Sequence, residues 1–368
     1  MKIGIDTFGC NHSQSGAGSY LLNCISNFVP QKDLEIVFFG YEIDRFTYIK
    51  NDKISFVSAN IPDNRASELK WHKRKLKRFC KKNKFDVVIF VAFENVLPLK
   101  IKSKSIAILN SIASNAFVEN GKSYKKRFLK SLKYSTKIIT GTEFIKNDLM
   151  NFGISDEKIS VVHNGIDHKL FFPFVNSEEE YINVNPFAIK RPYFVYGSQI
   201  SHSDKKHIQL IKAFEIFKKN TNKPHRLVIA GSNGEYAEDV HKAVMNSPFA
   251  SDIFLTGYFP HDSFATLYAG ASACVFPSVN EGVGLPILEA MACGIPILCS
   301  DKGALKEVGG DVPLYFNSDD EVEIAEDMQK IVEDEDLRKK MIESGLKKST
   351  LYNWKDTISQ TLDIAKNL

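Results

Sequence analysis

The chain has 368 residues, of which 43% are hydrophobic and 25% charged, a balance typical of a globular protein that excludes wholesale disorder. At about 150 residues per domain, this length predicts two domains. The net charge of +4 conceals an asymmetry, because residues 1–172 hold 28 Lys and Arg against 16 Asp and Glu, whereas the remainder holds 20 against 28. A basic half joined to an acidic half suggests two domains that meet different partners.

The first half of the sequence alternates between short apolar runs and amphipathic stretches. It opens with a buried strand at 2–6 in place of an apolar leader, so no signal peptide is expected. Further strands are predicted at 34–39, 85–90, 105–109, 137–140 and 159–162, and helices at 19–28, 67–84, 122–134 and 142–152. Strands separated by helices predict a parallel, doubly wound sheet, which we assign to an N-terminal domain of residues 1–172.

The pattern breaks at 173–192, where three prolines accompany the acidic run 178–180. We interpret this stretch as an interdomain linker. The alternation then resumes in a C-terminal domain, 193–348, with strands predicted at 193–196, 226–230, 253–255, 273–276 and 296–299. Residues 319–348 are predicted to be acidic and helical, and 349–368 are expected to form a helix that packs back on the N-terminal domain.

Two further features bear on the location of the protein. The longest apolar runs, such as 86–93, fall far short of the roughly 20 residues that a membrane-spanning helix needs. The six cysteines form no C-x-x-C pair, which indicates reduced, mostly buried thiols. We therefore expect a cytoplasmic protein.

The most informative segment is 278–294, between the fourth strand of the C-terminal domain and a helix. Its two glycines permit close backbone approach, and Pro286 suits a first helical turn. Free N–H groups and the helix dipole make such a position an anion site suited to a diphosphate. Glu281 on the loop and Glu289 in the first turn of the helix bracket this site, and each can accept hydrogen bonds from sugar hydroxyls. Two glutamates at this spacing alone would indicate only a solvated turn, whereas the whole segment favours a functional site.

The string Glu-Gly-x-Gly-Leu-Pro-x-x-Glu-Ala-Met-Ala-x-Gly-x-Pro resembles the signature of the family-4 retaining glycosyltransferases. That family has the GT-B architecture, an α/β fold in which two Rossmann-like doubly wound parallel-sheet domains face a cleft. The resemblance covers nearly the whole chain and is most specific at 197–311. It implies that Glu281 is a catalytic residue against the donor sugar and that Glu289 binds the nucleotide ribose. It also implies that the diphosphate or sugar is held by the backbone of Gly282, Val283, Gly284 and Leu285.

A second candidate site follows the strand 193–196. The resemblance implies that Gly197 contacts the donor and that a cation before the next helix neutralises the diphosphate, both in binding and as the leaving group departs. The family usually has an Arg and a Lys here. This chain has Asp204-Lys205-Lys206, so Lys205 is the predicted catalytic cation, Lys206 is the alternative, and the Arg is missing. A solvated helix start would explain either lysine alone.

The N-terminal domain supplies weaker candidates. A dinucleotide-binding fingerprint fails after Gly16-Ala-Gly18 because position 21 is Leu, which disfavours an NAD-dependent oxidoreductase. The resemblance implies that Gly16 and Gly18 form a loop facing the donor phosphate, although a plain turn explains them equally well. Asn110 and Ser111 stand where many relatives carry His-Asp. They are candidates for sugar contacts, but neither is a credible general base.

No cofactor or metal ion is expected. No D-x-D pair stands in a convincing loop, which agrees with the metal independence that the resemblance implies. His12 and His163 lie near the predicted site, but a structural or solvated role is the simpler expectation for a lone histidine.

Two segments are strongly basic. Lys70–Lys84 contains nine Lys or Arg and no acid, and Lys122–Lys137 adds seven more. Solvated helix faces explain them simply, whereas a functional explanation is attraction to anionic lipid headgroups at roughly 1 kcal/mol per cation. Nucleic acid is not expected, because no nucleic-acid-binding module accompanies the charge.

These features together predict a retaining, metal-independent hexosyltransferase. It would move a hexose, such as mannose, from a GDP- or UDP-linked donor to a glycan or lipid-linked acceptor. The expected setting is bacterial surface polysaccharide synthesis, in the cytoplasm or on the inner face of the plasma membrane. A GT-B-type nucleotide-sugar epimerase or sugar phosphorylase is one alternative, and a non-catalytic sugar-binding or scaffold protein is another.

Overall fold

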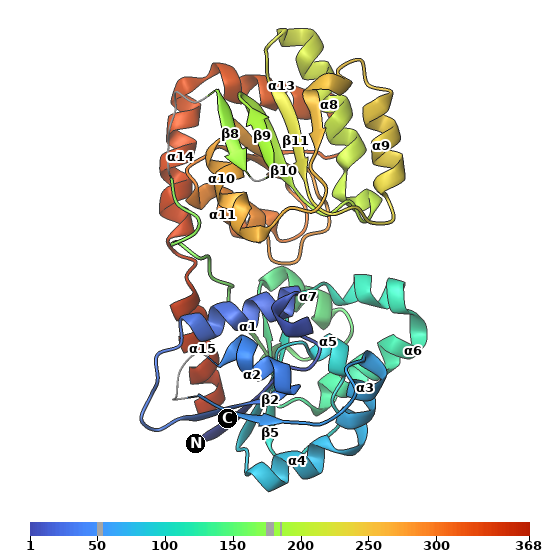
Figure 1. The fold of residues 1–368 in the computed structure, drawn as a ribbon, viewed down its shortest axis with the longest axis vertical. Coiled ribbons are helices and arrows are strands. Elements are labelled where there is room, and N and C mark those ends of the chain that lie inside the picture. Colours follow the sequence, from blue (N-terminus) through green and yellow to red (C-terminus); the bar gives the residue numbers. More distant parts are fainter. Residues whose placement is uncertain (50–53, 174–179, 185) are drawn as a thin grey trace. The chain divides into compact units, whose positions relative to one another are not determined.

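The computed structural model describes residues 1–49, 54–173, 180–184 and 186–368. It divides into two compact units, each an α/β layer structure (Figure 1). Unit 1 consists of Met1–Gly165 and Asn353–Leu368, and unit 2 of Ile166–Tyr352. The boundary lies earlier than the predicted 172, because the backbone N–H of Ile166 donates to the carbonyl of Tyr352 at 3.1 Å and ties this segment to unit 2.

Unit 1 is built on a seven-stranded parallel sheet with the order β3-β2-β1-β4-β5-β6-β7. The strands are β1 Lys2–Asp6, β2 Glu35–Gly40, β3 Ile54–Ser58, β4 Val87–Phe90, β5 Lys104–Leu109, β6 Lys137–Thr140 and β7 Ile159–Val161. The strand order reverses at β1, which pairs with β2 on one side and β4 on the other. In doubly wound sheets this reversal point is where ligands bind, at the carboxyl ends of the strands.

Helices cover both faces of the unit 1 sheet. They are α1 Gly16–Ser26, α2 Glu42–Tyr48, α3 Arg65–Arg74, α4 Leu76–Asn83, α5 Phe93–Val96, α6 Ala113–Tyr134, α7 Glu143–Met150 and α15 Trp354–Lys366. One core contains Trp71, Phe93 and Phe128 from the α3 to α7 side. The other contains Tyr20 and Trp354 from α1 and α15, which lie side by side (Figure 1). The predicted C-terminal helix, 349–368, corresponds to α15.

Three local predictions for unit 1 need correction. The glycine loop at 16–18 is the first turn of α1, because the Ser15 side chain caps the helix by accepting from Gly18 N at 3.1 Å. The helix predicted at 67–84 is two helices that meet at Lys75. The helix predicted at 122–134 begins at Ala113 and bends where Gly121 adopts a φ of +76°.

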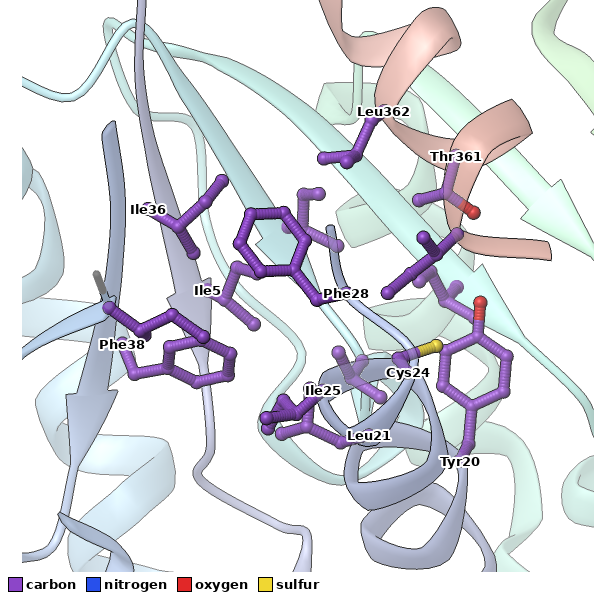
Figure 2. Close-up of a pocket in the computed structure, with 15 residues that line it drawn as sticks. Ile5, Tyr20, Leu21, Cys24, Ile25, Phe28, Ile36, Phe38, Thr361 and Leu362 are labelled. Atoms are coloured by element: carbon purple, nitrogen blue, oxygen red, sulfur yellow. The ribbon is translucent and has the colours of Figure 1, made fainter. Parts of the chain in front are cut away.

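A small apolar pocket lies under α1 and α15 (Figure 2). Leu21, Ile25 and Phe28 face Leu362 of α15 and the sheet residue Ile5 across a space of about 50 Å³. Small-molecule sites usually occupy about 300–1,000 Å³. The pocket is therefore too small for a ligand and reflects core packing.

Unit 2 is built on a six-stranded parallel sheet with the order β12-β11-β10-β13-β14-β15. The strands are β10 Tyr193–Gly197, β11 Arg226–Ala230, β12 Ile253–Leu255, β13 Ala273–Phe276, β14 Ile297–Ser300 and β15 Leu314–Phe316. The helices are α8 His207–Thr221, α9 Ala237–Met245, α10 Phe264–Ala269, α11 Leu285–Ala292, α12 Leu305–Gly309, α13 Glu321–Glu333 and α14 Glu335–Ser349. α13 packs on α8 and α14 packs on α11. Two doubly wound parallel sheets therefore confirm the predicted fold class.

The predicted linker, 173–192, contains regular structure that belongs to unit 2. β8 Tyr181–Val184 pairs antiparallel with β9 Phe187–Lys190. Ile182 and Ile189 are buried, and the Phe187 ring lies 5.3 Å from that of Phe254. The burial of these side chains on unit 2 explains the difference, although residues 174–179 and 185 of the stretch lie outside the described residues. Within the described residues, no helix has the length and apolarity needed to span a bilayer.

Candidate active site

Three loops at the carboxyl edge of the unit 2 sheet carry most of the predicted site residues. They follow β10, β13 and β14, which are neighbours in the sheet. Because parallel strands end at the same edge, residues that are far apart in sequence meet here. Lys205 comes from the first loop and Glu281 from the second, and the third supports the backbone of Glu281.

Lys205 and Glu281 form an ion pair, in which the lysine Nζ donates to Glu281 Oε1. Both side chains are largely buried, with 22% of Lys205 and 14% of Glu281 exposed. The backbone of Lys205 is anchored to the sheet, because the hydroxyl of buried Tyr196 on β10 donates to the Lys205 carbonyl at 2.8 Å. An ammonium has three N–H donors, so Lys205 can keep its bond to Glu281 and still donate to a second anion.

Asp204, which stands near the place of the missing Arg, ties the first two loops together. Its carbonyl accepts from Val279 N at 3.0 Å, and its Oδ2 accepts from Asn280 Nδ2 at 3.0 Å. The residues that form these two bonds are close neighbours of Lys205 and Glu281 in the sequence. Asp204 therefore aligns the loops that bear the two predicted catalytic residues. Sequence reasoning missed this role because the partners of Asp204 lie about 75 residues away.

Lys206 points to a different partner. Its Nζ donates to Asp319 Oδ1 at 2.6 Å, and its backbone adopts a left-handed φ of +55° immediately before α8. Lys205, not Lys206, thus contacts Glu281. The role of Lys205 as the catalytic cation stays a prediction.

Helix α11 begins at the predicted glycine motif. Gly284 is its N-cap residue with φ +62°, and Pro286 lies in the first turn, where a missing N–H leaves no donor unpaired. Since Leu285 is the first helical residue, Glu289 lies in the second turn, and the prediction that placed it in the first turn is wrong. The N-terminus of α11 directs backbone N–H groups and the positive end of its dipole toward the loop of Glu281.

Glu289 is paired with a histidine that the sequence analysis did not consider. His261, which follows β12, lies with Nε2 3.1 Å from Glu289 Oε1. The hydrogen bond to Glu289 raises the pKa of His261, outweighing the opposing effect of burial. Its ring also makes a T-shaped contact with that of Phe171, with centroids 5.4 Å apart. The segment after β12 thus meets helix α11 at the second glutamate of the motif.

We predict that Glu289→Gln will lower the pKa of His261 toward its ordinary value of about 6.5. Because the pKa of His261 is raised in the folded protein, the pair stabilises the fold fully below about pH 6.5. This stabilisation is lost as the pH rises through the pKa of His261 in the folded protein. Histidine NMR titration measures the shift directly. His241→Gln keeps the pair and serves as the control; an unchanged His261 pKa in Glu289→Gln would show that Glu289 is not its partner.

Gly303, after β14, is in contact with the backbone of Glu281. A Cβ at this position would come within 2.7 Å of the Glu281 carbonyl oxygen, and φ is +62°. Ala304 N also donates to that carbonyl at 2.8 Å. The third loop therefore fixes the position of the Glu281 backbone, and only glycine fits at position 303.

Gly303→Ala should therefore displace Glu281 and lower activity by about 10²-fold, because misplacement by about 1 Å has this effect in active sites. The assay is initial-rate sugar transfer alongside the midpoint of thermal unfolding. Gly153→Ala is the matched control: its φ is +78° but nothing lies within 4 Å of the added Cβ, so it carries the strain without the displacement. Equal activity losses in both variants would contradict the steric argument.

Gly197, the last residue of β10, is required by packing. A Cβ there would lie 2.6 Å from the hydroxyl of Tyr268 and 2.8 Å from Phe264. Its predicted contact with the donor stays a prediction, as do the roles of the backbone at 282–285. In the part of the chain that the structure describes, no three His, Cys, Asp or Glu side chains gather so as to hold a metal ion.

The unit 1 candidates are distributed along the carboxyl edge of their own sheet. Gly18 packs against the preceding loop, since a Cβ would lie 2.3 Å from the Cys10 carbonyl, whereas nothing lies within 4 Å of one at Gly16. Ser111 Oγ donates to the carboxylate of Glu94, and burial raises the pKa of Glu94. Asn110 follows β5 and is half-buried. Among the described residues, these four candidates form no hydrogen bond with one another.

His12 lies between two carboxylates. Its Nδ1 lies 2.6 Å from Asp44 Oδ1 and its Nε2 lies 3.0 Å from Asp63 Oδ2. Burial opposes a charge on the ring, but the hydrogen bonds to the two carboxylates outweigh it and raise the pKa of His12. His163 is bonded through Nδ1 to the carbonyl of Gly141 at 2.9 Å. The carbonyl of His163 also accepts from the hydroxyl of Thr357 in α15 at 2.8 Å.

Comparison with known proteins matches both units to glycosyltransferase families. A model described as "Glycosyl transferases group 1" matches residues 177–348, and one described as "Glycosyltransferase Family 4" matches residues 15–170. The sequence is 32% identical over 159 residues to O-antigen chain mannosyltransferase B of Escherichia coli, covering 43% of this chain and 42% of that protein. It is 27% identical over 193 residues to O-antigen chain mannosyltransferase RfbU of Salmonella typhimurium, covering 52% and 49%. The matched regions thus span less than half of each relative.

Solved structures share the fold of the entire chain. Sucrose-phosphate synthase from Thermosynechococcus elongatus superposes with a TM-score of 0.75 at 16% identity, covering 100% of this chain and 98% of that one. Anabaena HepE, solved in complex with UDP and glucose, superposes with a TM-score of 0.74 at 15% identity and covers 100% of both chains. At these identities the likeness concerns the fold.

Proposed function

The chain belongs to the family-4 glycosyltransferases with the GT-B fold, and from this premise we propose that it moves a hexose from a nucleotide-diphosphate sugar to a glycan or lipid-linked acceptor. The observation that carries the proposal is the Lys205–Glu281 pair beside the N-terminus of α11. The cation and the helix N-terminus complement the negative charge of the diphosphate, and the carboxylate complements the positive charge that develops on the sugar.

Each part of this site has a chemical task in the proposed reaction. The N-terminus of α11, with the backbone at 282–285, and Lys205 stabilise the negative charge that develops on the leaving diphosphate. Glu281 orients the sugar and supports the positive charge that develops at its anomeric carbon. The leaving diphosphate accepts the proton of the attacking hydroxyl on the same face, which retains the anomeric configuration. No side chain is required as a general base, in keeping with Asn110 and Ser111 in unit 1.

Mannose is the proposed sugar, because the matched curated relatives are named as O-antigen mannosyltransferases. Synthesis of a bacterial surface polysaccharide is the corresponding role. We place the reaction in the cytoplasm, since all six cysteines are unpaired and buried. The basic segments 70–84 and 122–137 are suited to an anionic membrane surface on that side.

A thermal-shift screen against GDP-mannose, UDP-glucose and ADP-glucose tests the donor site. A donor at 100 times its Kd stabilises the folded state by about 2.7 kcal/mol, which raises Tm by about 5–10 °C for a unit of this size. We expect GDP-mannose to give the largest shift and free mannose none. Product NMR in the presence of EDTA then reports the anomeric configuration and metal independence. If no nucleotide sugar raises Tm, the proposed function is wrong.

A further inference from the structure

Two hollows of unit 1 are each lined by residues of α3 and α6. The first, which we call the polar trough, has a volume of about 440 Å³, and its polar lining consists of Arg65, Glu94, Asn95, Ser111, Asn115, Glu119, Asn120 and Tyr124. The second, the basic groove, has a volume of about 440 Å³ and is lined by Lys70, Lys73, Arg74, Arg127 and Lys130 with three leucines. Helix α3, residues 94–99 and helix α6 contribute to both hollows, and residues 111–112 line only the trough.

The order of these residues places the two hollows end to end. On α3, Arg65 lines the trough and 70–74 line the groove; on α6, 115–120 line the trough and 127–130 the groove. Between them, Asn95 belongs to the trough and Leu97 to the groove. At about 1.5 Å per helical residue, Arg65 and Arg74 are separated by about 14 Å along α3. A single elongated ligand can therefore occupy both hollows.

The basic groove concentrates positive charge without compensation. Lys70, Lys73 and Arg74 share one face of α3 at i, i+3 and i+4, and Arg127 and Lys130 share one face of α6. In the described parts of the chain, none of the five forms an ion pair with a carboxylate. Cations that face one another in a hollow raise its potential and favour a multivalent anion. Five cations exceed the single charge of a phosphodiester and suit a diphosphate.

The floor of the basic groove is apolar. It is formed by Leu69, Leu97 and Leu99, of which Leu99 is 37% exposed. The aromatic residues of the basic segment do not contribute, because Trp71 is buried in the core and Phe79 packs against it. A diphosphate alone would gain nothing from three leucines, whereas one attached to a hydrocarbon chain would bury its first carbons there.

The polar trough has the opposite chemistry. Three asparagines contribute neutral amides and Ser111 contributes a hydroxyl, which donates to the carboxylate of Glu94. The carboxylates of Glu94 and Glu119 add acceptors for sugar hydroxyls, and Arg65 is the one cation in the lining. Amides both donate and accept hydrogen bonds, which matches the hydroxyls of a carbohydrate. From the trough to the groove, the lining thus changes from groups that complement a carbohydrate to groups that complement a diphosphate and a hydrocarbon chain.

We propose that these two hollows form the binding site for a glycan carried on a lipid diphosphate, with the glycan in the polar trough, the diphosphate among the five cations and the first lipid carbons on the leucines. This inference rests on the proposed function, because it names the acceptor of that reaction. It differs from a general attraction to a membrane, which would use the exposed cations of α4, Lys77, Lys81 and Lys82, as much as those of the groove.

Isothermal titration calorimetry of the full chain with farnesyl diphosphate tests the groove. Lys70→Gln/Lys73→Gln/Lys130→Gln removes three groove cations, and Lys77→Gln/Lys81→Gln/Lys82→Gln removes three outside it. We expect the first variant to bind at least about tenfold more weakly and the second within about twofold of wild type, since hydrogen bonds to charged groups are the strong ones. Leu99→Ser should weaken binding of farnesyl diphosphate but not of inorganic diphosphate. Equal losses in the two triple variants, or no measurable binding, would overturn the proposal.

Two further measurements separate the possible sources of failure. Binding to phosphatidylglycerol vesicles shows bulk membrane attraction; if both triple variants lose it equally and bind farnesyl diphosphate like wild type, a membrane surface replaces the proposed ligand. The donor thermal shift should persist in the groove variant, because the donor site lies in unit 2. Donor shifts without farnesyl diphosphate binding would overturn only the groove, whereas binding without any donor shift would overturn only the proposed function.

Discussion

Replacement of Glu281 with alanine should abolish sugar transfer and leave the fold intact. The isosteric Glu281→Gln should lower kcat by about 10²–10³-fold, because the carboxylate acts through charge that matters most in the transition state. The loop will keep its conformation, since Ala304 N is bonded to the backbone carbonyl of Glu281 and not to its side chain. The loss of activity should therefore appear in kcat more than in KM for the donor.

The measurement is initial-rate transfer of labelled mannose, with circular dichroism and Tm to verify folding. Glu238→Gln provides the control, because Glu238 is an exposed residue of α9 in the same unit and its removal changes the net charge equally. Wild-type turnover by Glu281→Gln would overturn the assignment of the site. A large fall in Tm would instead indicate a structural role.

The features that the sequence predicted well are those that depend on short segments. Alternation of strands and helices identified both parallel sheets, and the glycine–proline pattern located the start of α11. Glu281 and Lys205 were each singled out from their local motifs. Their direct pairing was not predicted, because it depends on two loops that adjacent strands bring together across 76 residues.

The features that escaped prediction depend on tertiary contacts. In the sequence, Asp204 is only a departure from the family pattern. Its role in aligning the loops becomes visible through its bonds to Val279 and Asn280. His261 belongs to no sequence motif. It pairs with Glu289 because the segment that follows β12 brings it next to α11. The predicted linker contains few residues with regular apolar spacing, and its strands form because Ile182 and Ile189 are buried on unit 2.

Lys205→Met should lower kcat by about 10²-fold or more, because the lysine is proposed to stabilise charge on the leaving diphosphate. Methionine retains the apolar stem, so the effect isolates the ammonium. Lys212→Met is the matched control, since Lys212 lies exposed on α8 and pairs with Glu321 at 3.7 Å. Lys206→Met should have a smaller effect than Lys205→Met, because the Lys206 ammonium contacts Asp319. The reverse ranking would make Lys206 the functional cation.

The double variant Glu281→Gln/Lys205→Met tests whether the two groups act as one unit. If the ion pair positions both groups for the same transition state, the double variant should lose little more activity than the worse single variant, with a coupling energy of about 0.5–3 kcal/mol. Each single change already removes one of the two charges and with it the ion pair, so the second change has less left to remove. Fully additive losses would mean that Glu281 and Lys205 act independently. The ion pair would then be a structural feature of the loops and not part of the catalytic mechanism.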